Sequence, residues 1–125
     1  MNAPRRVLPP LALLVISTLS PATAGDVEIV NIEVVTTGER TYRFDVTLRH
    51  ADSGWDHYAD GWEVLGPDGT PLGTRTLFHP HEEERPFTRG LDEVRVPAGI
   101  DRVQVRAHDS VHGYSKTSRA VILPP

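Results

Sequence analysis

The chain has 125 residues, with 13 basic residues, 17 acidic residues, six histidines and no cysteine. The net charge of −4 and the lack of any polybasic run argue against nucleic acid and anionic membranes as partners. The absence of cysteine excludes disulfide bonds, so a hydrophobic core must hold the fold together on its own. The length is that of a single domain.

Residues 1–24 are predicted to be a secretory signal peptide. They combine an arginine pair, an apolar stretch over residues 7–19 and the small-residue sequence ATA at 22–24, which places cleavage before Gly25. The apolar stretch is too short for a membrane span of roughly 20 residues, and no cysteine follows it to carry a lipid. We therefore expect a periplasmic or extracellular protein whose mature part is one domain, residues 25–125. Without the two arginines this part has 11 basic residues against 17 acidic ones, a net charge of −6.

Alternating apolar and polar residues recur along the rest of the chain between turn residues, a pattern typical of β-strands. It is clearest at 41–50, TYRFDVTLRH, where all the large apolar side chains fall on one face. Seven strands are predicted, at 27–36, 41–50, 62–66, 72–78, 87–96, 101–109 and 117–123. Seven short antiparallel strands predict an all-β immunoglobulin-like or fibronectin type III-like sandwich. Its expected core residues are Tyr42, Phe44, Val46, Leu48, Trp62, Val64, Phe87, Val103, Val105, Ala107 and Ile122.

Two segments carry resemblances to known proteins. The sequence VQVRAHDSVHGYSKTSRAVILP at 103–124 resembles the closing hairpin of fibronectin type III domains, in which an alternating strand leads through a glycine-containing loop to a serine-rich last strand. This resemblance implies the fold alone. Residues 53–89 resemble a segment of small uncharacterised secreted bacterial proteins, a resemblance that implies no activity.

The predicted loops divide into two groups, because connections between consecutive antiparallel strands alternate between the two ends of a sandwich. The short connections 37–40, 66–69 and 97–100 share one end, and the long connections 51–61, 79–86 and 110–116 share the other. All six histidines lie in or beside the long connections, together with seven carboxylates and three aromatic residues. Binding sites commonly occupy such clustered loops on a rigid scaffold.

The histidines predict a site for Zn²⁺ or Cu²⁺, ions for which imidazole is a suitable ligand. His79 and His81 flank Pro80, which favours an extended backbone, so both rings can face one ion. We expect these two with His112 as ligands, and His50 or His57 as the fourth. The mature chain has no methionine or cysteine, which argues against a Cu(I) carrier.

Other interpretations of the same residues stay open at this point. His50 continues the inward alternation of the second strand and could be a hydrogen-bonded residue at the edge of the core, whereas His108 has outward parity and could face solvent. A calcium site is less well supported, since the spacing of Asp52, Asp56 and Asp60 matches no calcium-binding loop.

The main alternative to a metal site is a recognition module that binds a protein, peptide or glycan through the same long loops. Trp55, Tyr58 and Tyr114 would provide contact area, and Arg85 with Arg89 would provide bidentate donors. Trp62 is expected in the core instead. An enzyme is the least supported class, since neither Ser53 nor Ser110 lies in a recognisable nucleophile motif. The expected function is thus a non-enzymatic binding domain whose only expected cofactor is Zn or Cu.

Overall fold

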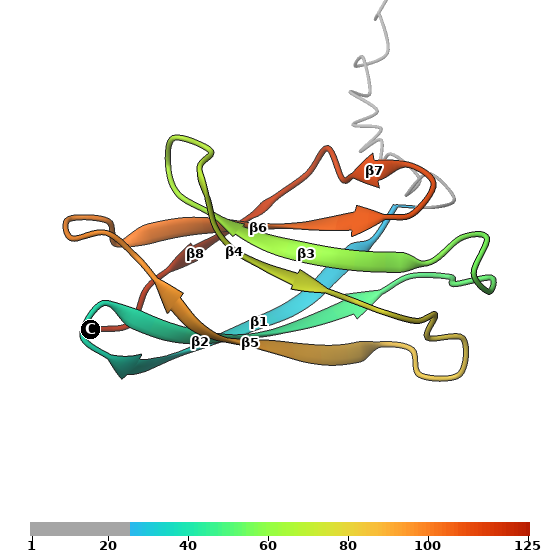
Figure 1. Cartoon of the computed structure of the whole chain (residues 1–125), viewed down its shortest axis with the longest axis horizontal. Coiled ribbons are helices and arrows are strands. Elements are labelled where there is room, and N and C mark those ends of the chain that lie inside the picture. Colours follow the sequence, from blue (N-terminus) through green and yellow to red (C-terminus); the bar gives the residue numbers. More distant parts are fainter. Residues whose placement is uncertain (1–25) are drawn as a thin grey trace, which may run out of the picture.

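The computed structural model describes residues 26–125, so the predicted signal peptide lies outside the described residues. These residues form two antiparallel β-sheets (Figure 1), which confirms the all-β prediction. Within this part of the chain, no helix is long and apolar enough to cross a membrane.

The two sheets have three and five strands. The first sheet has the order β1-β2-β5, with β2 central and paired to both neighbours. The second has the order β4-β3-β6, and β6 also pairs with β7 and β8. The strands are β1 (Glu28–Gly38), β2 (Thr41–Arg49), β3 (Ala59–Leu65), β4 (Pro71–Thr76), β5 (Phe87–Arg95), β6 (Arg102–Asp109), β7 (Gly113–Tyr114) and β8 (Arg119–Ile122).

The core lies between the sheets and is built from the predicted alternation. Every second residue of β2 and of β6 is buried, because successive side chains of a strand point to opposite faces. Trp62 and Phe44 are the largest fully buried side chains, and Trp62 thus belongs to the core as expected. Full burial of each large apolar side chain contributes about 1.5–3 kcal/mol, so this face stabilises the domain.

The last predicted strand, 117–123, differs from the structure in extent and in facing. The structure has the shorter β8 in its place and the two-residue β7 within the predicted connection 110–116, and Ile122, expected in the core, is 78% exposed. The register explains the error: Val121 pairs with the buried Val103, so Val121 and Leu123 face inward while Ile122 faces solvent.

The third strand also starts earlier than predicted. It begins at Ala59, because this residue pairs with Asp109 and Gly61 pairs with His108. The segment has no apolar alternation, and its pairing with β6 makes it a strand.

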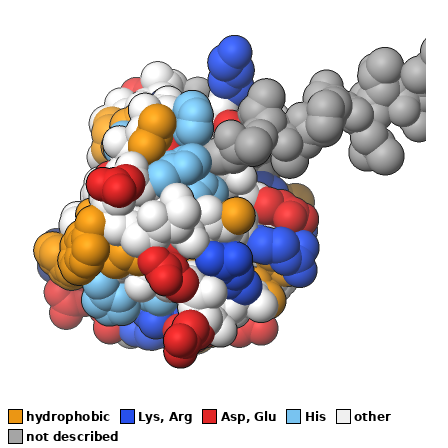
Figure 2. All heavy atoms as spheres, turned by 90° about the vertical axis from the view of Figure 1, so that its right-hand side faces the viewer, with side chains coloured by type: hydrophobic (Ala, Val, Ile, Leu, Met, Phe, Trp, Pro, Cys, Tyr) orange, Lys and Arg blue, Asp and Glu red, His pale blue; other side chains and the backbone are white. Residues whose placement is uncertain are grey.

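The long connections all lie at the end of the molecule drawn on the right in Figure 1, and the short ones lie at the opposite end. We call the right-hand end, formed by residues 50–58, 77–86 and 110–114, the long-loop end. Hydrogen bonds hold these loops against one another: the Ser110 amide donates to the Tyr58 carbonyl over 2.9 Å, and Arg85 Nη2 donates to the Asp52 carbonyl over 2.6 Å. Figure 2 shows histidine and acidic side chains side by side on this end.

Candidate functional site

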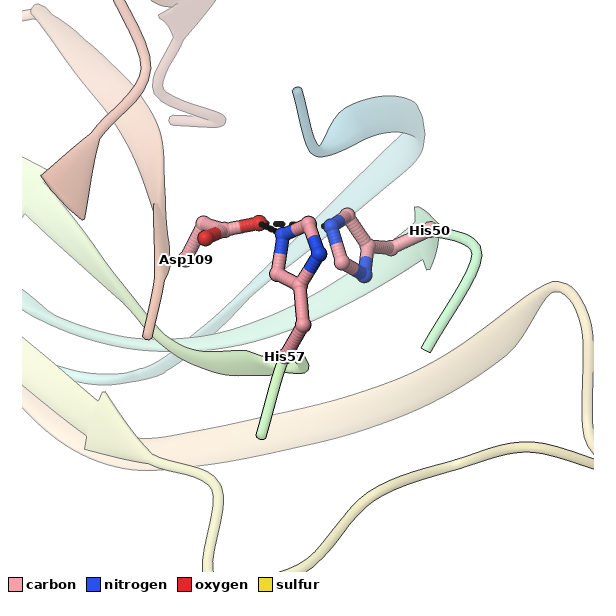
Figure 3. Close-up of side chains that lie close together, drawn as sticks. All are labelled: His50, His57 and Asp109. Atoms are coloured by element: carbon pink, nitrogen blue, oxygen red, sulfur yellow. Dashed lines mark hydrogen bonds and ion pairs between the residues drawn. The ribbon is translucent and has the colours of Figure 1, made fainter. Parts of the chain in front are cut away.

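Three segments bring polar side chains together where the two sheets meet at the long-loop end. His50 directly follows β2 of the first sheet, and Asp109 is the last residue of β6 in the second. His57 comes from the loop that connects the sheets, just before β3. Figure 3 shows the two imidazole rings on the Asp109 carboxylate. We call His50, His57 and Asp109 the histidine–aspartate centre.

The geometry of the centre is compact. Asp109 Oδ2 lies 2.6 Å from Nε2 of His50 and 2.6 Å from Nε2 of His57. One ligand atom from each of the three residues falls within 4.8 Å of the others, so the three could hold a metal ion. The two rings meet edge to face, with centroids 4.9 Å apart. Two imidazoles on one zinc ion have centroids roughly 5 Å apart, since each Zn–N bond is about 2 Å long.

Asp109 is fixed from its other side by the loop that follows it. Its Oδ1 accepts hydrogen bonds from the amides of Val111 and His112, over 2.7 Å and 2.8 Å, and lies 3.2 Å from His112 Nδ1. Burial pushes the pKa of Asp109 up, but these amides and the neighbouring His57 and His50 outweigh it and lower the pKa from 3.8 to about 2. The Asp109 carboxylate therefore stays ionised in the folded protein at neutral pH.

His50 is oriented by a second buried carboxylate. Its Nδ1 donates to Asp52 Oδ1 over 2.5 Å, and both side chains are almost completely buried. Asp52 is itself held by the amide of Ala59 at 3.0 Å and the amide of His81 at 2.7 Å. A carboxylate on one nitrogen and a ligand position on the other is the usual arrangement around metal-binding histidines.

The hydrogen bonds also indicate which protons a bound metal ion would replace. Both nitrogens of His50 face carboxylate oxygens, so both carry protons in this arrangement, and His57 Nε2 donates to Asp109 as well. A divalent cation would take the place of the two Nε2 protons. The donor atoms would then separate from 2.6 Å to roughly 3.3 Å, a shift of under 1 Å that keeps an ion about 2 Å from each.

Solvent reaches the centre through His57 and His112. The His57 side chain is 23% exposed and that of His112 is 49% exposed, whereas His50 and Asp109 are buried. The rings of His57 and His112 have centroids 5.0 Å apart. His112 thus lies beside the centre, although it is not one of the three described residues whose ligand atoms lie within 4.8 Å of one another.

The predicted ligand histidines thus fall into two groups. His50, His57 and His112 meet at Asp109, whereas His79 and His81 form a separate pair in the 77–86 loop, with ring centroids 4.7 Å apart. The structure therefore does not place His79 and His81 on the Asp109 carboxylate that the other three histidines surround.

His108 belongs to neither group. Its Nδ1 pairs with Asp60 and its ring packs edge-on against Tyr114, on the outer side of β6. This half-exposed position agrees with its outward parity in the sequence.

The residues predicted to contact a partner have different surroundings. Trp55 is 67% exposed and packs edge-on against Tyr58, with ring centroids 5.6 Å apart. Tyr114 carries the Arg106 guanidinium 3.9 Å from its ring centroid and donates its hydroxyl to Glu63. Arg85 donates to the Asp52 carbonyl. Trp55 is thus the most available of these side chains for a partner.

Asp109 was not predicted from the sequence as a ligand, and Asp52 was considered only as part of the less well supported calcium site. A signal for Asp109 was present: it continues the inward alternation of Val103, Val105 and Ala107, so a carboxylate was due at the end of the core. Asp52 lies in an irregular loop, where alternation gives no direction.

Comparisons with known proteins give one similarity to report. No protein-family model matches the chain, and no solved structure matches it. A curated protein of Halomicrobium mukohataei, named "Putative lipoprotein", is 41% identical over 96 residues, which are 77% of this chain and 47% of that protein. The chain thus spans about half the length of this relative.

Proposed function

We propose that the protein is an exported, non-enzymatic domain that binds a divalent transition metal, Zn²⁺ or Cu²⁺, at the histidine–aspartate centre. The observation that carries this proposal is the alignment of His50 between two buried carboxylates. Asp52 fixes Nδ1, and Nε2 is directed to the point where Asp109 Oδ2 and His57 Nε2 converge. His112 is the fourth ligand, and the partly exposed His57 and His112 form the entry path.

Charge and chemistry support a divalent ion over a purely structural network. Two buried carboxylates face one buried imidazole, so a divalent cation would complete the charge balance that protons provide in the metal-free state. Nitrogen ligands favour Zn²⁺ and Cu²⁺ over Ca²⁺ and Mg²⁺, which prefer oxygen. Three protein ligands with a fourth position near solvent suit a tetrahedral ion.

Calorimetric titration of the purified protein with Zn²⁺ and Cu²⁺ tests the proposal. His57→Ala should weaken binding at the centre more than about 100-fold, because even changes to supporting residues cost 10–100-fold. His108→Ala is the matched control, since it removes an imidazole at the same end that contacts Asp60 instead of Asp109. Equal affinity in wild type and His57→Ala would reject the centre as a metal site.

The fold within this proposal is an immunoglobulin-like or fibronectin type III-like sandwich. The strand order supports it: the first, second and fifth strands share one sheet, and the third, sixth and last share the other, as in immunoglobulin domains. Here β4 pairs with β3 and extends the second sheet. Pairing of the fourth strand with the third is the fibronectin type III-like arrangement. An experimental structure in which β4 joins the first sheet would contradict it.

The proposed location is the periplasm or the outside of the cell, after cleavage behind Ala24. The relative's name supports export, and so does the signal-like sequence of residues 1–24. Mass spectrometry of the protein recovered after expression with export should give Gly25 as the N-terminus. A retained Met1 on the exported protein would contradict it.

A metal-independent recognition module is the second candidate, favoured by the exposed apolar side chains of the long-loop end. Trp55, Phe78 and Val111 are all more than half exposed. Exposed apolar side chains that form one patch are typical of contact with a partner molecule. Binding on a glycan array or to a peptide library that persists in a chelator and is lost in Trp55→Ala would favour this candidate.

A further inference from the structure

The wall of a cavity next to the histidine–aspartate centre contains the histidine pair that the centre does not use. The cavity has a volume of about 530 Å³ and is lined by Gly54, Trp55, residues 79–84 and Arg89. His79 and His81 lie side by side in this wall, with ring centroids 4.7 Å apart and planes tilted by 41°. We call this cavity the Trp55 cavity.

His81 is the unusual residue of this wall. It is 6% exposed and stacks on Phe87 with centroids 3.9 Å apart, yet neither of its ring nitrogens has a hydrogen-bond partner among the described residues. Buried polar atoms are nearly always paired, because leaving one without a partner destabilises the fold. The backbone amide of His81 is anchored to Asp52 Oδ2, and stacking on Phe87 holds the buried ring in its orientation.

His79 supplies the complementary donor atom. Its Nδ1 donates to the Pro80 carbonyl over 3.2 Å, which places the proton on Nδ1 and leaves the Nε2 lone pair for a ligand. Unlike His81, His79 is exposed, so its ring can adjust. A hydrogen bond on one nitrogen and an unprotonated second nitrogen is the state in which neutral imidazole binds metals.

We propose that His79 and His81 form a second transition-metal site, distinct from the histidine–aspartate centre, with the Glu84 carboxylate as third ligand. The separation of the two rings matches the roughly 5 Å expected for imidazoles that share one ion. An ion between them gives the buried His81 ring the partner that it lacks. Because the cavity is open to solvent, water completes the coordination.

Glu84 lines the same cavity and is the carboxylate that we assign to this role. Among the described residues, the ligand atoms of Glu84, His79 and His81 do not all lie within 4.8 Å of one another, so the exposed Glu84 side chain would move towards the two rings to complete the site. It interacts electrostatically with both imidazoles, and its oxygens lie 3.0 Å and 3.4 Å from the two Nη atoms of Arg89. An ionised carboxylate offers about four lone-pair positions, so Glu84 can contact Arg89 and an ion together. Arg89 then acts as a positioning residue that holds the carboxylate beside the rings.

The two sites are separable even though Asp52 touches both. Asp52 Oδ1 accepts from His50 Nδ1 in the centre, while Oδ2 accepts from the His81 amide behind the cavity wall. No ligand is shared between them, so a variant of one leaves the donor atoms of the other in place. The second site therefore stands whether or not the centre binds metal.

Titration with Cu²⁺, followed by calorimetry and electron paramagnetic resonance, tests the second site. If both sites bind, wild type takes up two equivalents, His79→Ala and His57→Ala one each, and His108→Ala two. His79→Ala should also lose the spectrum of a copper ion with two imidazole nitrogens, and Glu84→Gln should weaken that equivalent by more than about 10-fold. If His57→Ala matches wild type while His79→Ala loses its equivalent, the centre fails and the second site stands.

A second measurement covers weak or unresolved binding. Zn²⁺ should shift the imidazole nitrogen resonances of His79 and His81 together in a nuclear magnetic resonance titration. Unchanged stoichiometry and spectrum in His79→Ala, or resonances of His79 and His81 that do not move with Zn²⁺, would overturn the second site.

Discussion

His50 Nδ1 and Asp52 Oδ1 lie 2.5 Å apart at the buried end of the core, and only Ala51 lies between the two residues in the chain. This contact joins the last inward position of the first sheet to the long-loop end. Asp52 also accepts hydrogen bonds from the backbone amides of Ala59 and His81. One carboxylate therefore links the start of β3 to the loop that forms the cavity wall. The orientation of the His50 ring and the shape of the loops therefore depend on the same side chain.

Asp52→Asn should lower the free energy of unfolding by about 3 kcal/mol, since it replaces a buried charge-assisted acceptor with a group that presents N–H to other donors. Chemical denaturation monitored by tryptophan fluorescence measures the loss. Asp60→Asn is the matched control, because the Asp60 pair with His108 is partly exposed, and its loss should stay within about 1 kcal/mol. Equal losses in the two variants would contradict a structural role for Asp52.

Asp109 should make stability fall in acid. Its pKa is about 2 in the folded protein, against an ordinary value of 3.8, so its contribution is fully present above pH 3.8 and is lost as the pH falls through about 2. At 1.36 kcal/mol per pKa unit the contribution is about 2 kcal/mol. Unfolding free energies between pH 6 and pH 2 should show this loss in wild type.

The Asp109→Asn variant separates this effect from other acidic groups. Asp68 and Glu84 also have lowered pKa values, from hydrogen bonds to Thr70 and to Arg89, so they too contribute to the loss of stability in acid. The difference between the unfolding free energies of wild type and Asp109→Asn, followed against pH, should isolate the contribution of Asp109. Carboxyl-carbon resonances provide a direct check, and a midpoint for Asp109 near 4 would contradict the prediction.

The all-β architecture was predictable because it rests on alternation, and the exception shows where alternation fails. In β2 and β6 the apolar residues occupy every second position, so only one face of each strand can point into the core. The end of β8 and the residue after it read Ala120-Val121-Ile122-Leu123. These residues are all apolar, so the sequence does not indicate which of them face the core. Pairing of Val121 with Val103 decides it.

A pair of variants tests the facing of the last strand. Leu123→Ala should cost about 2–4 kcal/mol of unfolding free energy, because Leu123 is buried and its removal leaves a cavity. Ile122→Ala should change stability by no more than about 0.5 kcal/mol, because Ile122 is exposed. Thermal or chemical denaturation of both proteins gives the comparison. A larger loss in Ile122→Ala would favour the facing predicted from sequence.

The location of the histidines was predictable, whereas their grouping was not. Strand alternation and loop order place all six at the long-loop end. Which rings meet depends on side-chain directions within irregular loops, where no periodicity applies. Asp109 collects His50, His57 and His112 because it ends β6 facing inward, while His81 is drawn onto Phe87 by stacking and faces the Trp55 cavity instead.

Metal binding at the centre should appear as thermal stabilisation. A ligand at 100 times its dissociation constant stabilises the folded state by about 2.7 kcal/mol, which raises the melting temperature of a domain this size by on the order of 10 °C. The effect should be smaller at pH 5.5 than at pH 7.5, because protons compete with the ion for the Nε2 atoms of His50 and His57. Scanning calorimetry of the chelator-treated protein with added Zn²⁺ measures both shifts. His57→Ala should lose most of the shift at pH 7.5, whereas His108→Ala should keep it, since its imidazole does not contact Asp109. A shift that is equal at the two pH values, or equal in His57→Ala and wild type, would mean that the histidine–aspartate centre is not the source of the stabilisation.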